Sequence, residues 1–95
     1  MVAQEITQRR QEILRIAAKH GARNVRVFGS FARGEASADS DIDLLVDVAA
    51  VHSSFFPGGL REDLVELLGR NVDIVTEDAL HWYVRDRVLK EAIPL

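Results

Sequence analysis

The order of hydrophobic and polar positions predicts alternating helices and short strands. Apolar residues recur at helical spacing over residues 4–20, 60–68 and about 78–91. Short apolar runs predict strands at residues 25–28, 42–48 and 71–75, and a single helical turn is expected over residues 30–32. This order of elements predicts an α+β fold, in which a small mixed sheet of about three strands has helices packed on it.

Composition narrows the class of protein. The 95 residues, 47% of them hydrophobic and 28% charged, are typical of one soluble globular domain, which we expect to span residues 1–95. Cysteine is absent, so disulfides, thiolate zinc sites and cysteine nucleophiles are excluded. The net charge of −3 argues against stable nucleic acid binding. We see no secretion signal and no apolar run of membrane-spanning length, and we therefore expect a cytoplasmic protein without membrane contact.

Three aspartates interrupt or flank the predicted strands. Successive strand residues point to opposite faces, so Asp41 and Asp43 share one face while Ile42 and Leu44 share the other. Asp73 interrupts the strand over residues 71–75 in the same way, and all three carboxylates converge if the two strands pair in a suitable register. Like charges held together are costly unless a divalent cation with a preference for oxygen ligands lies between them. The pattern therefore predicts a magnesium site.

A glycine–serine turn lies between the first strand and the aspartate pair. Gly29 and Ser30 offer backbone N–H groups that suit the β- and γ-phosphates of a nucleotide. Arg33 is a candidate charge clamp on the same triphosphate, and the alternative is a surface salt bridge. A phosphate turn beside paired carboxylates indicates nucleotidyl transfer, in which Asp73 would ligate the metal ion nearest the nucleophile.

These motifs resemble those of the DNA polymerase beta-type nucleotidyltransferase superfamily. Within it, the chain is most similar to the minimal nucleotidyltransferases encoded beside HEPN-domain proteins, and the likeness runs from about residue 13 to residue 94. The resemblance implies a nucleotidyltransferase fold, ATP as substrate and a two-metal site for Mg²⁺, with Mn²⁺ as a second candidate. By motif position it implies metal-binding and catalytic roles for Asp41, Asp43 and Asp73. It implies phosphate-binding roles for three further residues, Gly29, Ser30 and Arg33.

The resemblance also implies a biological role. Members of this group are antitoxins, and some transfer AMP from ATP to a tyrosine of a partner HEPN ribonuclease toxin, with which we expect a hetero-oligomer. Two alternatives stay open: an antitoxin with a silent site that neutralises its toxin by direct binding, and a nucleotidyltransferase acting on a small molecule. Larger relatives use a second domain to hold the base and the acceptor. In this chain either the partner completes the site or catalysis is weak.

Several residues outside these motifs also carry predictions, and for some of them two interpretations stay open. Asp47 either joins the rim of the site or ends its strand in solvent. The three histidines lack metal-like spacing and are predicted to be surface residues: His20, His52 and His81. Four aromatic residues either fold back onto the core or form a docking surface for a partner: Phe55, Phe56, Trp82 and Tyr83.

Overall fold

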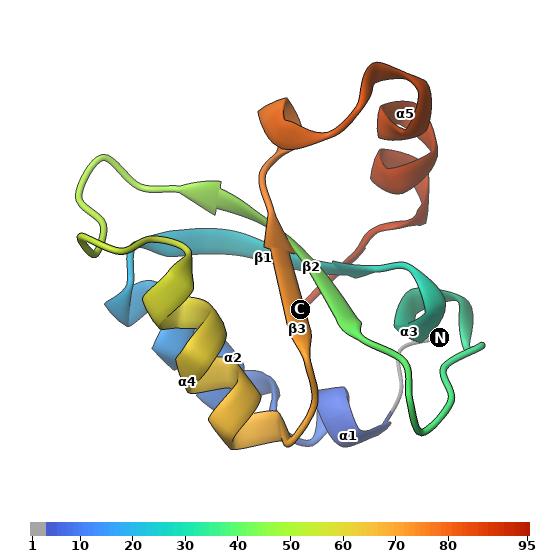
Figure 1. Cartoon of the computed structure of the whole chain (residues 1–95), viewed down its shortest axis with the longest axis horizontal. Coiled ribbons are helices and arrows are strands. Elements are labelled where there is room, and N and C mark those ends of the chain that lie inside the picture. The colour runs from blue at the N-terminus through green and yellow to red at the C-terminus, as the bar shows by residue number, and fades with distance from the viewer. Residues whose placement is uncertain (1–3) are drawn as a thin grey trace.

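The computed structural model describes residues 4–95 (Figure 1). The first part of the chain forms α1 (Gln4–Thr7), α2 (Arg10–Lys19), β1 (Ala22–Phe28), α3 (Ser30–Arg33) and β2 (Ile42–Val48). The second part forms α4 (Gly58–Leu68), β3 (Val72–Val75), the 3₁₀ helix η1 (Glu77–Ala79), α5 (Trp82–Glu91) and β4 (Ile93–Pro94). The helices and strands alternate along the chain as the hydrophobic pattern predicts. Residues 1–3 of the expected domain lie outside the described residues.

The strands form one mixed sheet in the order β3-β2-β1-β4. Strands β2 and β3 run parallel, whereas β1 is antiparallel to both β2 and β4. The predicted α+β class is confirmed, but the sheet has four strands and not three. The missing strand, β4, consists of Ile93 and Pro94 alone, and it pairs along the edge of the sheet. Proline lacks the N–H that a central strand needs, so a segment that contains it is not predicted as a strand. At the edge of a sheet, however, proline is tolerated.

Two helices, α2 and α4, cover one face of the sheet and enclose the core (Figure 1). Alternate residues of β2 point into this core, where they meet apolar side chains of α2 and α4: Ile42, Leu44, Val46, Ile13, Leu60 and Leu64. The intervening residues of β2, among them Asp43 and Leu45, therefore face the other side of the sheet. Helix α5 lies on that other side, away from α2 and α4 (Figure 1). The layers thus leave one face of the sheet free for chemistry beside α5.

Two of the predicted helices are interrupted. The helix expected over residues 4–20 is divided into α1 and α2 by a turn at residues 8 and 9. The hydrophobic pattern does not reveal this break, because it continues on both sides of the turn, where Ile6 and Ile13 are both buried. The helix expected to begin near residue 78 starts instead with η1, and α5 follows only at Trp82 because the backbone at Leu80 is extended.

His20 is not the surface residue that we expected, and this prediction is wrong. Its side chain is only 13% exposed. Its Nδ1 lies 3.0 Å from Ser53 Oγ, and its Nε2 lies 2.7 Å from Asp63 Oδ2. The ring therefore ties the end of α2 to the loop before α4 and to α4 itself. Its partners are 33 and 43 residues away along the chain, so spacing gave no signal of them.

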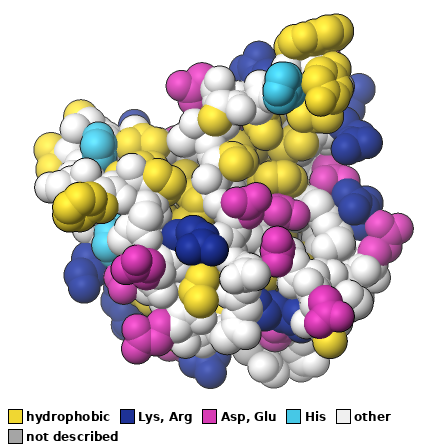
Figure 2. Space-filling model, in the orientation of Figure 1, with side chains coloured by type: hydrophobic (Ala, Val, Ile, Leu, Met, Phe, Trp, Pro, Cys, Tyr) yellow, Lys and Arg dark blue, Asp and Glu magenta, His cyan; other side chains and the backbone are white. Residues whose placement is uncertain are grey.

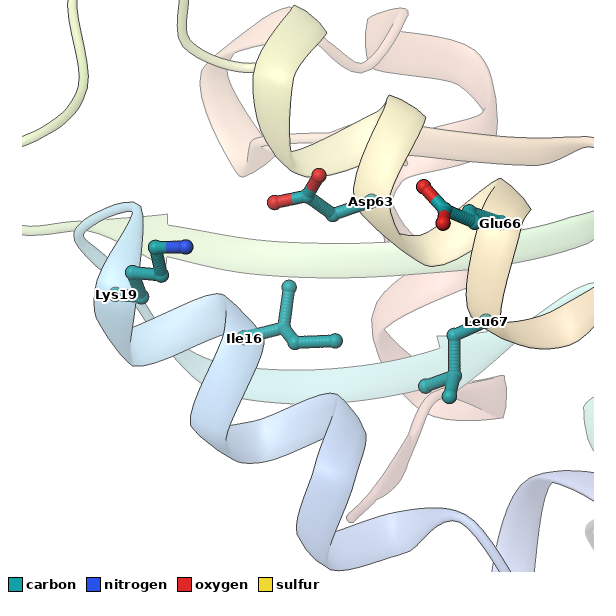
Figure 3. Close-up of a pocket in the computed structure, with 5 residues that line it drawn as sticks. All are labelled: Ile16, Lys19, Asp63, Glu66 and Leu67. Atoms are coloured by element: carbon teal, nitrogen blue, oxygen red, sulfur yellow. The ribbon is translucent and has the colours of Figure 1, made fainter.

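A shallow groove of about 500 Å³ lies between α2 and α4 (Figure 3). Ile16 and Lys19 line it from α2, and Asp63, Glu66 and Leu67 line it from α4. Because both helices cover the face opposite Asp43, this groove is separate from the aspartate pair.

The four aromatic residues divide between the two interpretations. Phe56 packs against the core. Phe55, Trp82 and Tyr83 are 83%, 84% and 66% exposed, so they remain available to a partner. Figure 2 shows hydrophobic side chains projecting at the edges of this view of the molecule. Within residues 4–95, no helix has the length and apolar character needed to cross a membrane.

Candidate active site

The register of β2 and β3 brings two aspartates face to face. Asp43 and Asp73 are direct partners on these neighbouring parallel strands, so their side chains project from the same face of the sheet. Asp41 immediately precedes β2, and its negative charge also acts on Asp43. Figure 2 shows acidic side chains gathered near the middle of this view, next to hydrophobic surface. The sequence could not supply this register, and the register in the structure is the one that convergence of the carboxylates requires.

The carboxyl group of Asp43 has a strongly perturbed pKa. Its pKa is raised from 3.8 to about 6, first because the group is partly buried and then because Asp73 and Asp41 repel its charge. Glu91 adds further repulsion, while Arg33 acts in the opposite direction. The ionised form of Asp43 is therefore unfavourable in the protein alone and would be stabilised by a cation.

The raised pKa of Asp43 makes the stability of the metal-free protein depend on pH. An acid whose pKa is higher in the folded state stabilises the fold below its ordinary pKa, and this contribution is lost as the pH rises through about 6. After allowance for solvent screening of a half-exposed group, we expect a loss of roughly 1–2 kcal/mol between about pH 4.5 and 7.5. Asp43→Asn should therefore raise the melting temperature at about pH 7.5 by about 5 °C, and by little at about pH 4.5. Thermal melts with a chelator present would measure this difference, and equal melting temperatures at about pH 7.5 would contradict it.

Asp47 shows how an aspartate of the same strand can be satisfied within the protein. Its carboxylate accepts hydrogen bonds from Arg26 Nη2 at 2.9 Å and from Asn24 Nδ2 at 3.1 Å. Asp47 therefore pairs with cationic and amide donors of β1, in contrast to Asp43, which has acids as neighbours. The side chain of Asp47 is 41% exposed near the end of β2, so of its two interpretations the solvated strand end fits, with the pairing to Arg26 and Asn24 added.

The glycine–serine turn lies directly against Asp43. Gly29 follows β1, whose Phe28 is the direct partner of Asp43 on β2. The backbone of Gly29 has φ +73° and ψ −153°, a conformation that is open essentially to glycine alone. A Cβ atom at this position would overlap Asp43 Oδ2 and lie 3.2 Å from Asp43 Cγ. The backbone conformation therefore requires glycine here, and an added Cβ would also displace the Asp43 carboxylate, so the turn and the aspartate form one continuous site.

Arg33 and the Gly29 amide share a carboxylate that the sequence did not predict. Glu91 Oε2 accepts a hydrogen bond from the Gly29 N–H at 2.7 Å, and Glu91 Oε1 accepts one from Arg33 Nη1 at 2.7 Å. Arg33 Nε also donates to Glu35 Oε1 at 2.7 Å. These bonds, that to Glu35 first, raise the pKa of Arg33. In this structure Arg33 thus makes the salt bridge that was the alternative to a phosphate clamp.

Strand β4 explains how Glu91 reaches the turn. Val27 and Ile93 are direct antiparallel partners, so the register places Glu91, two residues before Ile93, beside Gly29, two residues after Val27. Burial favours a higher pKa for Glu91, but the hydrogen bonds from Arg33 and Gly29 outweigh it and hold the pKa below its ordinary value. Glu91 is therefore ionised when it occupies the turn. Only recognition of β4 and its register could have revealed this residue.

The carboxylate groups on this face suit a divalent cation, although they do not form a complete coordination site. Carboxylate oxygens are the ligands that Mg²⁺ prefers, and the mutual repulsion at Asp43 is the kind that a cation relieves. Among residues 4–95, no group of three or more acidic, histidine or cysteine side chains is close enough to hold a metal ion by itself. Magnesium commonly takes some of its ligands from substrate phosphates, so protein groups alone need not complete its coordination.

A glycine turn against paired aspartates on one face of a sheet is an arrangement that suits a phosphorylated ligand bound together with a metal ion. The chain belongs to the nucleotidyltransferase domain family, whose family model matches residues 10–95. The resemblance to nucleotidyltransferases drawn from the motifs is thereby confirmed, and the protein is classed as a nucleotidyltransferase enzyme.

Curated relatives cover most of the chain. It is 38% identical over 88 residues to the "Putative protein adenylyltransferase MJ0435" of Methanocaldococcus jannaschii, with 93% of this chain and 95% of the relative aligned. It is 41% identical over 75 residues to the "Protein adenylyltransferase MntA" of Thermococcus cleftensis, with 79% of this chain and 76% of the relative aligned.

Solved structures share the fold. One described as "Structure of putative minimal nucleotidyltransferase" matches with a TM-score of 0.85 and 47% identity, covering all of this chain and 97% of that one. A second, described as "Crystal structure of the toxin-antitoxin with AMP-PNP", matches with a TM-score of 0.74 and 20% identity, covering 97% of this chain and 72% of that one. At that identity the second likeness concerns the fold alone.

Proposed function

We propose that this protein is an antitoxin that transfers AMP from ATP to a tyrosine of a partner HEPN ribonuclease toxin. The observation that carries the proposal is that the Gly29 turn contacts Asp43, and that Asp43 is the direct partner of Asp73 on the neighbouring strand. The names of the two adenylyltransferase relatives support protein as the acceptor. In this proposal residues 1–95 act as a single nucleotidyltransferase domain in the cytoplasm, bound to the toxin.

The proposed reaction is a displacement at the α-phosphorus of ATP. The phenol oxygen of the toxin's tyrosine forms a bond to this phosphorus, and the bond from it to the bridging oxygen of the β-phosphate breaks, so that pyrophosphate leaves. Asp73 would accept the phenol proton, which then passes to solvent. Asp41, Asp43 and Asp73 would hold Mg²⁺ or Mn²⁺, which when bound neutralises developing charge on the attacking and leaving oxygens.

The turn residues have the task of holding the rest of the nucleotide. The Gly29 amide would donate to a β- or γ-phosphate oxygen, with Ser30 beside it. Arg33 would pair with the same phosphates, because a guanidinium fits two phosphate oxygens at once. Held in this way, the triphosphate presents its α-phosphorus toward the aspartates and excludes part of the surrounding water.

Labelled ATP tests the proposed reaction. The protein is incubated with Mg²⁺ and the product of the adjacent gene, with the label on the α-phosphate in one reaction and on the γ-phosphate in another. We expect the partner to acquire the α-label only, and a Tyr→Phe change at the modified position should abolish it. Labelling from γ-labelled ATP, or labelling of the partner when this protein is omitted, would contradict AMP transfer by this site.

The exposed aromatic residues favour a second candidate function, neutralisation of a toxin by binding alone. Trp82 and Tyr83 at the start of α5 are 84% and 66% exposed, and such residues are frequent anchors of protein interfaces. Asp41→Asn separates the two functions in cells that express the toxin. If binding suffices, this variant protects as well as the wild type. If AMP transfer is required, protection is lost while the folded variant still binds the toxin. Transfer to a small molecule would require turnover of such an acceptor by the purified protein alone.

A further inference from the structure

The phosphate turn is occupied by a side chain of the same protein. Both oxygens of the Glu91 carboxylate are engaged, one with the Gly29 N–H and the other with Arg33 Nη1, each at 2.7 Å. The Glu91 side chain is only 15% exposed, so it is well enclosed by its partners. These two donors are the groups that the proposed function assigns to the triphosphate.

A carboxylate and a phosphate cannot use these donors at the same time. A backbone N–H donates one good hydrogen bond, and at 2.7 Å the bond to Glu91 is short and charge-assisted. A triphosphate brought to the same turn would also meet the negative charge of Glu91 at close range. Nucleotide and carboxylate are thus mutually exclusive occupants of the turn.

We propose that Glu91 is a built-in competitor of the nucleotide, so that ATP binds only after its phosphates displace the Glu91 carboxylate from Gly29 and Arg33. The inference rests on the proposed function, since it concerns the same turn. It makes Glu91 a residue that sets the affinity for ATP without a role in the chemical step. Displacement requires only the Glu91 side chain to move, since the backbone beside it is held by hydrogen bonds from Ala92 N–H to Val88 O and from Leu95 N–H to Val25 O.

Glu35 supplies a matched control. It carries the same charge and also accepts a hydrogen bond from Arg33 at 2.7 Å, but its bond is to Nε and it has no bond with the Gly29 amide among those that the structure records. Glu35→Gln therefore removes one negative charge beside Arg33 and leaves the competitor in place. Glu91→Ala removes both the charge and the acceptor, whereas Glu91→Gln removes the charge and keeps an acceptor oxygen.

Calorimetric titration with ATP, with and without Mg²⁺, measures the effect. We expect Glu91→Ala to lower the dissociation constant for ATP by about tenfold, Glu91→Gln to lower it by less, and Glu35→Gln to change it by less than about twofold. The gain in Glu91→Ala should persist at high salt, where a long-range charge effect would be screened. Equal gains in Glu35→Gln and Glu91→Ala, or unchanged or weaker binding in Glu91→Ala, would overturn the inference.

The amide NMR signal of Gly29 gives a test that needs no stable variant. In the wild type, ATP should shift this signal as its partner changes from carboxylate to phosphate, and Glu91→Gln should shift it without ATP. A Gly29 signal that stays unchanged when wild-type protein binds ATP would overturn the inference alone. Absence of ATP binding by every variant, Glu91→Ala included, would overturn both the inference and the proposed function.

Discussion

Asp43→Asn is expected to reduce AMP transfer by roughly a hundredfold or more, with the protein still folded. Asp43 lies at the centre of the cluster: it contacts the Gly29 turn and is the direct partner of Asp73. An amide in its place carries no charge and is a weaker ligand for a divalent cation, so both the metal and the triphosphate would be held less firmly. Initial rates of partner labelling at saturating ATP and Mg²⁺ measure the loss.

Asp47→Asn is the matched control for this change. Asp47 lies on the same strand and, by alternation along β2, on the same face as Asp43. Its carboxylate is bonded to Arg26 and Asn24, away from the turn. We expect Asp47→Asn to keep most of the transfer activity but to lower the melting temperature, the reverse of Asp43→Asn on both counts. Equal rates in the Asp43→Asn variant and the wild type would remove Asp43 from the catalytic site.

Gly29→Ala is expected to abolish ATP binding in the measurable range and to destabilise the fold by about 2 kcal/mol. The destabilisation has a backbone cause, because φ +73° with ψ −153° costs a residue with a side chain about 1–3 kcal/mol. The loss of binding has a steric cause, because the added Cβ overlaps Asp43 Oδ2 and must push the carboxylate or the turn aside. Calorimetric titration with ATP, at a temperature where the variant is folded, separates the two effects.

Gly69→Ala provides the comparison, because it also places a side chain at a positive φ, in the less costly left-handed helical region, and it lacks the steric cause. Gly69 ends α4 with φ +68°, and a Cβ added there would meet no atom within 4 Å. We expect a loss of about 1 kcal/mol of stability and an unchanged dissociation constant for ATP. If Gly29→Ala binds ATP as Gly69→Ala does, the turn is not the phosphate site.

Local patterns were enough to predict most of the fold. The sequence of β2 predicted the strand over residues 42–48. It also predicted that Asp43 lies on the opposite face from Ile42 and Leu44, because successive residues of a strand point to opposite faces. The α+β class and its covering helices followed from the same periodicities. Strand β4 did not, because two residues that include a proline carry no periodicity of their own.

Pairings between distant segments could not be predicted in the same way. The partnership of Asp43 with Asp73 depends on the register of β2 and β3, which the sequence left undetermined. Glu91 depends in turn on the register of β1 and β4, so it was missed altogether. The hydrogen bonds of His20 to Ser53 and Asp63 were missed for the same reason, since they join segments that only the folded chain brings together.

Without metal and nucleotide, the arrangement of charged groups in the site is energetically unfavourable. Asp43 is held near other acids and its pKa rises to about 6, while the donors of the turn are satisfied by Glu91. A metal-bound nucleotide would relieve the charge repulsion at Asp43, since it brings cations to the acids. It would also replace Glu91 at the turn, since it brings phosphates to the same donors. Stability and activity should therefore change in opposite directions when Asp43 is replaced, which is a common property of active sites.

Paramagnetic broadening by Mn²⁺ tests the central claim most directly. Mn²⁺ is titrated into isotopically labelled protein together with a non-hydrolysable ATP analogue, and the loss of amide signals locates the ion. The account predicts that the signals of residues 41–43, Asp73 and Gly29 broaden first. Broadening centred instead on the groove between α2 and α4, where Asp63 and Glu66 lie, or loss of signal at Asp41 and Asp43 without Asp73, would contradict it.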